Sequence, residues 1–271
     1  MLYPRNDQMV SSLESEFQKS NDSSFAHESL ISSYLALPGL RGFWPMSGIS
    51  SIGTIYDMGG GDLHLLNVNT VPVIGWPMPA AFFQTSLSEV LYAADVAAFD
   101  IIGNEAHIYA NWQGLTIGAW VKIDAVDIAQ SIDGKFSTAA GNRSYLLHID
   151  SSNYPQFYVS GDGTATSYIE REVELVADRW YFMVGRFDPS TEVKLWVDDV
   201  SVANTTSIPA TIFNGTASFT VGANGTGPAT FGNYFGGKIS CAFLCTARID
   251  DSTIRRLYYR TRAAFQNRSQ W

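Results

Sequence analysis

Three glutamates at alternate positions, Glu170, Glu172 and Glu174, form a pattern that could hydrolyse a glycosidic bond. In an extended strand they share one face, and neighbouring members stand about 6.6 Å apart along the strand. Carboxyl pairs about 5–5.5 Å apart serve retaining glycosidases, and pairs about 6.5–9.5 Å apart serve inverting ones. The spacing of the three glutamates therefore permits catalysis of glycoside hydrolysis. Because Arg171 and Arg179 lie nearby and could pair with these acids, we favour a solvated, charged strand.

A nucleophilic triad has weaker support. His148 beside Asp150 is the strand histidine with a nearby acid, and no Gly-x-Ser-x-Gly elbow accompanies it. We interpret His148 as an exposed or hydrogen-bonded strand residue. The glycines at 59–61 lack the Lys-Ser/Thr of a phosphate-binding loop. We therefore predict a protein that is not an enzyme and that uses no cofactor.

Tryptophans outside the expected core pattern are candidates for ligand contacts. Sugars stack on exposed aromatic rings, and nearby polar groups fix their hydroxyls. We take Trp76, Trp112 and Trp120 as candidate glycan-binding residues. Packing in a core or an interface is the alternative, since tryptophan is well buried on average.

The charge and composition narrow the classes of partner. The formal net charge is −9, which disfavours binding to nucleic acid or to an anionic membrane by the overall field. No run of eighteen apolar residues occurs, and the first residues lack the hydrophobic stretch of a signal peptide. We expect synthesis and folding in a cytoplasm.

The chain has two cysteines, Cys241 and Cys245, in one strand-like run. Four strand residues span about 13 Å, whereas a disulfide requires Cα atoms within about 7 Å. The two thiols therefore cannot bridge each other, and we predict that they are reduced and buried. Two thiols without a nearby histidine form no recognisable zinc site, so we predict no metal.

Residues 1–38 are polar and serine-rich, with Leu13 and Phe17 among apolar residues at roughly helical intervals. We predict a partly helical arm that ends near Pro38-Gly39 and packs on its own domain or on a neighbour. Leu13 and Phe17 are its candidate interface residues.

Residues 39–271 are expected to form one domain of antiparallel strands. In 115–124 the odd-numbered positions from Leu115 to Ile123 are apolar, which predicts a half-buried strand with Trp120 on its other face. The runs 144–150 with 156–162, and 180–188 with 193–199, predict two hairpins. In 239–249, Ile239, Cys241 and Cys245 are expected to share one face.

A closing helix is predicted near 251–264, with Asp251 or Ser252 as its N-cap. Arg256 and Arg260 fall on one face of this helix and are candidate interface residues. They could dock on an acidic neighbouring protein. Alternatively, they supply favourable charge near the helix C-terminus and pair with the protein's own acids.

The order of these segments resembles the LamG-like branch of the concanavalin A-like lectin/glucanase jelly rolls. The match covers about residues 39–262, in the stretches GLRGFWPM and YDMGGGDLHL (39–65), LTIGAWVKID (115–124), DRWYFMVGRFDPSTEVKLWVDDVSVAN (178–204), FTVGAN (219–224) and GGKISCAFLCTARIDDSTIRRLY (236–258). The Trp180 strand and the LWVDDV hairpin are the most specific pieces. With the two helical segments, the resemblance implies an all-β, two-sheet antiparallel jelly-roll sandwich.

Two positions depart from relatives that hold calcium. Such relatives often carry aspartates where this chain has Gln84 and Ser240. Calcium needs several hard oxygen ligands, so the resemblance does not extend to a calcium site.

A looser resemblance links the chain to lone LamG-like proteins that tailed bacteriophages encode beside their structural genes. It implies a non-enzymatic virion surface protein, such as a capsid decoration protein, made in the host cytoplasm. Its partners would be capsid subunits and copies of itself. The alternative is a lectin-like adhesin that binds glycans, and a glycoside hydrolase comes third.

Overall fold

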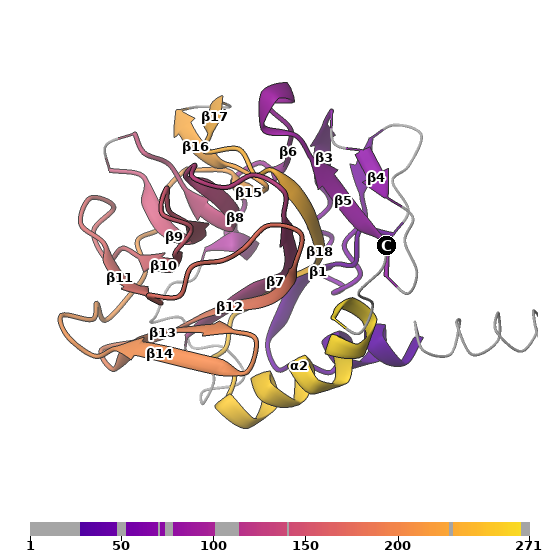
Figure 1. Ribbon diagram of the computed structural model, residues 1–271. Coiled ribbons are helices and arrows are strands. Elements are labelled where there is room, and N and C mark those ends of the chain that lie inside the picture. Colours follow the sequence, from indigo (N-terminus) through magenta and orange to yellow (C-terminus); the bar gives the residue numbers. More distant parts are fainter. Residues whose placement is uncertain are drawn as a thin grey trace, which may run out of the picture.

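The computed structural model describes residues 28–47, 53–69, 71–73, 78–100, 114–139, 141–227 and 230–266. Two antiparallel β-sheets pack face to face, and two helices lie against one of them (Figure 1). This arrangement confirms the predicted jelly-roll sandwich. Trp76, Trp112, Leu13 and Phe17 lie outside the described residues.

The first sheet carries the helices on its outer face. In spatial order it contains β14 (Val200–Asn204), β13 (Glu192–Val197), β12 (Trp180–Asp188), β7 (Leu115–Ile123), β18 (Gly237–Cys245), β5 (Ala80–Phe83) and β4 (Val71–Val73), with β1 (Leu40–Trp44) also paired to β18. Strands β12 and β13 pair antiparallel, as the hairpin prediction requires.

The second sheet has an outer face that no helix of the described residues covers. It contains β11 (Ser167–Glu170), β10 (Pro155–Val159), β9 (Arg143–Ile149), β8 (Gln130–Phe136), β15 (Phe219–Val221), β6 (Val90–Ala93), β3 (Leu65–Val68) and β2 (Thr54–Ile55). Strands β9 and β10 form the other predicted hairpin. A small hairpin, β16 (Asn224–Gly227) with β17 (Thr230–Gly232), stands beside β8, and two short 3-10 helices occupy Thr85–Leu87 and Ala97–Phe99.

Strand β7 is buried on both faces. Its apolar alternation is as predicted, and one face contributes to the core between the sheets with Leu115, Ile117, Ala119, Val121 and Ile123. Trp120 points the other way, into a second apolar cluster, and Lys122 is the one partly exposed residue of the strand. The expectation of a half-buried strand is wrong because helices cover the outer face of this sheet.

The covering helices are a short helix at residues 28–35 and α2 (Asp251–Phe265). Leu30, Tyr34 and Leu37 join the second apolar cluster together with Leu257 and Phe265 of α2. Tyr34 is fully buried and stacks on Phe43 of β1, with ring centroids 4.6 Å apart. The helix at 28–35 is therefore part of the folded sandwich.

Helix α2 is capped by Asp250, one residue before the two predicted cap positions. The Asp250 side chain accepts a hydrogen bond from the Thr253 backbone N–H (2.8 Å), which satisfies a donor that the helix leaves free. Hydrogen bonds from Ser252 and Thr253 lower the pKa of Asp250 to about 2, although partial burial opposes the shift.

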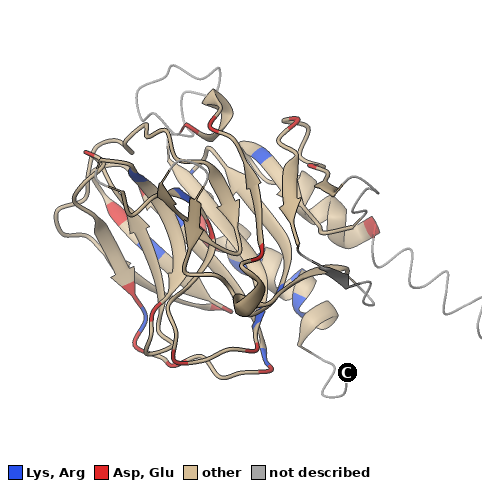
Figure 2. Cartoon of the chain, turned by 90° about the horizontal axis from the view of Figure 1, so that it is seen from above, with Lys and Arg blue, Asp and Glu red and all other residues tan. Residues whose placement is uncertain are grey.

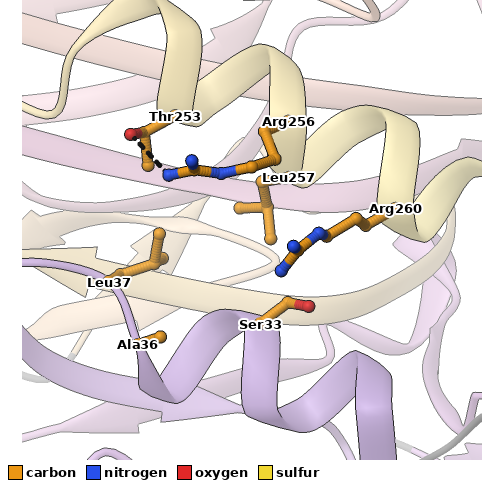
Figure 3. A pocket seen from close by; sticks show the side chains of 7 residues that line it. All are labelled: Ser33, Ala36, Leu37, Thr253, Arg256, Leu257 and Arg260. Carbon is orange, nitrogen blue, oxygen red and sulfur yellow. Dashed lines mark hydrogen bonds between the residues drawn. The ribbon is translucent and has the colours of Figure 1, made fainter.

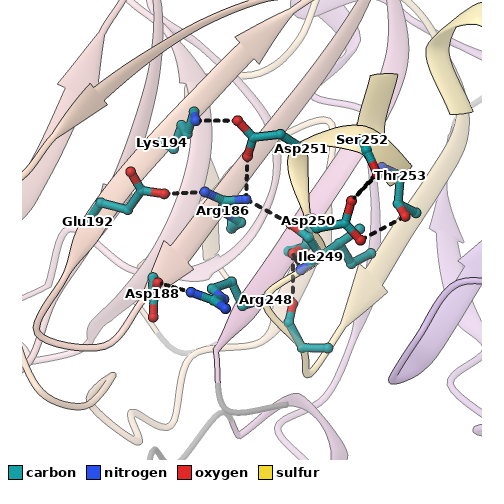
Figure 4. A network of polar contacts seen from close by, with 12 residues as sticks. Arg186, Asp188, Glu192, Lys194, Arg248, Ile249, Asp250, Asp251, Ser252 and Thr253 are labelled. Carbon is teal, nitrogen blue, oxygen red and sulfur yellow. Dashed lines mark hydrogen bonds and ion pairs between the residues drawn. The ribbon is translucent and has the colours of Figure 1, made fainter. Parts of the chain in front are cut away.

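An ionic network holds the start of α2 on the β12–β13 hairpin (Figure 4). Arg186 donates to Asp251 (2.7 Å) and pairs with Glu192, and Lys194 donates to the other Asp251 oxygen (2.6 Å). Arg186 is almost fully buried, and the carboxylates of Asp251 and Glu192 balance its positive charge in this region shielded from water. These cations are therefore engaged within the fold.

Strand β18 contains a bulge that divides its faces. The pairing register with β7 shifts between Ser240 and Phe243, and Cys241 has a φ of +51°. Ile239 consequently lies in the core between the sheets, while Cys241 and Cys245 lie in the second cluster. The expected single face is wrong. Both cysteines are free and buried, as predicted, and burial raises the pKa of Cys241 to about 12.

Candidate functional site

The outer face of β9, β10 and β11 carries a compact set of aromatic and polar side chains. In β10, Phe157 and Val159 enter the core, so Gln156 and Tyr158 face outward. Strand β11 pairs with β10 in a register that places Tyr168 opposite Tyr158 and Glu170 opposite Gln156. His148 of β9 lies opposite Gln156 on the other side. We call this set, with Asp150, the β9–β11 face.

Two tyrosines form the aromatic part of this face. The rings of Tyr158 and Tyr168 stack with centroids 5.4 Å apart and planes 25° apart. Tyr168 is 49% exposed, whereas Tyr158 is partly buried and makes a T-shaped contact with His148. Tyr168 therefore presents an accessible ring, and its stacking on Tyr158 helps to fix the orientation of that ring.

Gln156 lies at the centre of the polar part. Its Nε2 donates to Glu170 Oε2 and to Asp150 Oδ2, the latter at 3.4 Å. Its Oε1 accepts from the Tyr158 hydroxyl. Burial, assisted by the neighbouring Tyr168 hydroxyl and by the negative charges of Glu170 and Asp150, raises the pKa of Tyr158 to about 12. Tyr158 is thus a donor at neutral pH, and the two carboxylates keep further acceptor capacity.

His148 belongs to the support of this face. Its Nδ1 lies 3.3 Å from Ser131 Oγ, and Ser131 in turn donates to Asn224 of the β16–β17 hairpin (3.1 Å). Burial lowers the pKa of His148 to about 4, although the Asp150 charge opposes the shift. The interpretation of His148 as a hydrogen-bonded strand residue is confirmed. Ser131 is fully buried, so it offers no accessible nucleophile.

The β16–β17 hairpin borders the face. Phe231 of β17 packs on Tyr92 of β6, with ring centroids 5.3 Å apart. Strand β16 also contacts β8, and Figure 1 shows this hairpin standing beside the second sheet. The hairpin therefore covers the outer side of the sheet near β6 and β8, next to the β9–β11 face.

The three alternating glutamates do not share a strand. Strand β11 ends at Glu170, and the exposed Glu172 and Glu174 follow it in an irregular segment. Glu174 accepts a hydrogen bond from Asn153 at 3.5 Å, while Glu170 joins Gln156. The prediction of a charged strand is wrong. The hydrolase alternative requires the three carboxylates at alternate positions of one strand, and the structure does not have that arrangement.

Trp120 is a packing residue in the structure. Its side chain is fully buried, its indole N–H donates to Thr261 Oγ1 (3.0 Å), and its ring stacks on Phe265 at 4.5 Å. Both partners belong to α2, which covers the ring. Trp120 therefore offers no surface for sugar stacking.

The remaining predicted residues lie elsewhere. Arg256 and Arg260 are exposed on α2, on the opposite side of the sandwich from the β9–β11 face. Ser240, one of the two positions compared with calcium-binding relatives, is buried and donates to the Pro79 carbonyl (2.7 Å). No group of three or more His, Cys, Asp or Glu within the described residues is arranged to hold a metal. Nor is any helix in these segments long and apolar enough to cross a membrane.

The sequence analysis did not single out Gln156, Tyr158 and Tyr168. A signal was present, because apolar Phe157 and Val159 alternate with Gln156 and Tyr158 in one strand-like run. The pairing of Tyr168 with Tyr158 depends on the register of β11, which the sequence pattern leaves open.

Solved structures share the fold at low sequence identity. The binding domain of Paraclostridial Mosquitocidal Protein 1 matches with a TM-score of 0.63 and 8% identity, over 81% of this chain and 52% of that one. The binding domain of botulinum neurotoxin serotype G matches with a TM-score of 0.58 and 9% identity, over 81% and 50%. A Trypanosoma rangeli sialidase in complex with sialic acid gives 0.57 and 15%, over 90% and 38%. The chain thus spans about half the length of the two binding domains and less than half of the sialidase.

Sequence comparison points to one family. No curated protein matches the sequence significantly. A family model described as the concanavalin A-like lectin/glucanases superfamily matches residues 102–246, more than half of the chain. That segment runs from before β7 to the end of β18 and includes the β9–β11 face. This chain belongs to the concanavalin A-like lectin/glucanases superfamily.

Proposed function

We propose that the chain is a non-enzymatic, lectin-like protein that binds a glycan on the β9–β11 face. The observation that carries this proposal is the stacked pair of Tyr158 and Tyr168 beside the hydrogen-bonded Asp150, Gln156 and Glu170. An exposed ring can accept the apolar C–H face of a sugar. The adjacent carboxylates of Asp150 and Glu170 can then accept hydrogen bonds from its hydroxyls, and the buried Gln156 amide holds both carboxylates in place before the ligand arrives.

The family and the structural neighbours support a binding role. The family description includes lectins, and two of the neighbours are named binding domains of toxins. The sialidase neighbour keeps hydrolysis among the functions of related folds. For this chain we favour binding, since Glu172 and Glu174 lie outside the strand and Ser131 is buried.

The test is a glycan array with the full chain, followed by affinity measurements on the best ligand. Tyr168→Ala should weaken binding at least tenfold, about 1.4 kcal/mol, because it removes the exposed half of the stacked pair. Tyr56→Ala is the matched control, since Tyr56 is exposed to a similar degree, 45%, and lies on another part of the surface. Equal affinities for the two variants, or no glycan bound at all, would contradict the proposal.

A second candidate is a structural protein of a phage virion surface that contacts capsid subunits and other copies of itself. The exposed arginines of α2, which border the helix at 28–35, favour it, because they provide a basic contact surface on an acidic protein. This second candidate function would place the protein in the virion. Co-sedimentation with virus particles tests it, and symmetric positions in images of the complex would support it. Failure to bind any candidate particle would count against it.

A further inference from the structure

A pocket of about 270 Å³ opens between the helix at 28–35 and α2 (Figure 3). Its apolar lining consists of Ala36 and Leu37 on one side and Leu257 on the other. Leu37 and Leu257 are largely buried in the second apolar cluster, so the inner surface is built by the core and does not depend on mobile surface chains. This part of the pocket can take an apolar group.

The polar lining is cationic. Arg256 and Arg260 occupy positions four apart on α2, and Ser33 and Thr253 supply hydroxyls. Arg256 Nη2 donates to Thr253 Oγ1 (3.1 Å), and Figure 3 shows Arg260 extending from α2 toward Ser33. No carboxylate is among the residues that line the pocket. Two like charges therefore share one helix face without an acidic partner there, which is unfavourable until an anion joins them.

Several other cations of this protein are paired with carboxylates within the fold. Arg186, Lys194 and Lys135 each contact at least one carboxylate (Figure 4 shows the first two). Figure 2 likewise shows basic residues interspersed with acidic ones. In a chain of net charge −9, acidic partners are plentiful. The arginine pair in the pocket thus has charge available for an external ligand.

We propose that this pocket binds a small monocarboxylate whose apolar stem rests on Leu37 and Leu257. The planar guanidinium fork matches a carboxylate with paired hydrogen bonds. Inorganic phosphate would satisfy the charge but leave the apolar lining empty, so it should bind more weakly. The site lies on the first sheet's outer side and is independent of the proposed glycan-binding face.

The test is a titration of the isotope-labelled full chain with hexanoate at low salt, followed by NMR of the arginine Nε–H groups and the backbone amides around the pocket. We expect saturable shifts at Ser33, Leu257 and Arg260. Inorganic phosphate and the neutral 1-hexanol should bind at least tenfold more weakly. Absence of saturation, or equal affinity for phosphate, would overturn the proposal.

Substitutions locate the site. Arg256→Gln and Arg260→Gln should each weaken hexanoate binding at least tenfold. Arg255→Gln is the matched control, because Arg255 is exposed on the same helix and does not line the pocket. An equal loss in all three variants would mean that only net charge matters and would overturn the proposal. Self-association that hexanoate competes away would show that a carboxylate of a second copy of the chain occupies the pocket, and would overturn the proposal of a small-molecule ligand.

Discussion

His148 shows how burial determines the chemistry of a residue in this fold. The same imidazole on an open strand would titrate near neutral pH, whereas here it is 8% exposed and hydrogen-bonded to Ser131. Because burial disfavours the imidazolium, His148 stays neutral and positions groups around the β9–β11 face. It thereby contributes to stability rather than to proton transfer.

We predict that this burial makes stability depend on pH. The pKa of His148 falls from 6.5 to about 4 on folding, so the unfolded chain binds more protons between these values. Its contribution is present above pH 6.5 and is lost as the pH falls toward 4, by about 3 kcal/mol in all. Urea unfolding at both pH values should show a smaller loss for His148→Gln than for the unsubstituted protein.

The difference between the two proteins isolates His148. Asp133 is fully buried, and burial raises its pKa, so its contribution is greatest at low pH and has the opposite sign. Asp133 is present in both proteins, and its effect cancels in the comparison. Parallel losses of stability in the two proteins between pH 6.5 and 4 would show that His148 is not the group responsible.

Helix α2 depends on one residue for its start. Asp250 accepts from the Thr253 backbone N–H, and it precedes a helix that buries Ile254, Leu257 and Phe265 on the first sheet. We predict that Asp250→Ala lowers the free energy of unfolding by about 1 kcal/mol, through loss of the cap. Asp250→Asn should retain most of the stability, because an amide oxygen can also accept this bond. Equal stability of the Ala variant and the unsubstituted protein, measured by urea unfolding, would argue against the cap.

Individual elements were predictable where one local pattern determines them. The alternation from Leu115 to Ile123 identified the core face of β7, and the helical spacing identified α2. Two features were not predictable in this way. The bulge that separates Ile239 from Cys241 depends on pairing with β7, and the end of β11 at Glu170 depends on pairing with β10. Both are set by neighbouring strands and not by the residues' own propensities.

The candidate site was less predictable than the fold. Trp120 lies on the outer face of its strand as expected, yet α2 covers that face. Tyr158 and Tyr168 come together only through strand register. A strand pattern distinguishes one face from the other, but it does not tell which outer face a helix will cover.

In the described part of the molecule, helices cover the outer face of the first sheet but not that of the second. The helix at 28–35 and α2 bury the outer side of the first sheet, and neither helix packs on the β9–β11 face of the second sheet. Residues 28–37 contribute Leu30, Tyr34 and Leu37 to the second apolar cluster, so this part of the N-terminal segment stabilises the sandwich.

Two truncations test the contribution of residues 28–37 to stability. Removal of residues 1–37 should lower the free energy of unfolding by at least about 3 kcal/mol, because it takes Leu30, Tyr34 and Leu37 from the cluster and exposes Phe43, on which Tyr34 stacks. Removal of residues 1–27 keeps these contacts and serves as the control, with stability close to that of the full chain. Urea unfolding followed by tryptophan fluorescence measures both. If the protein without residues 1–37 were as stable as the protein without residues 1–27, the helix at 28–35 would not stabilise the sandwich. It would then not form a rigid side of the pocket that it shares with α2.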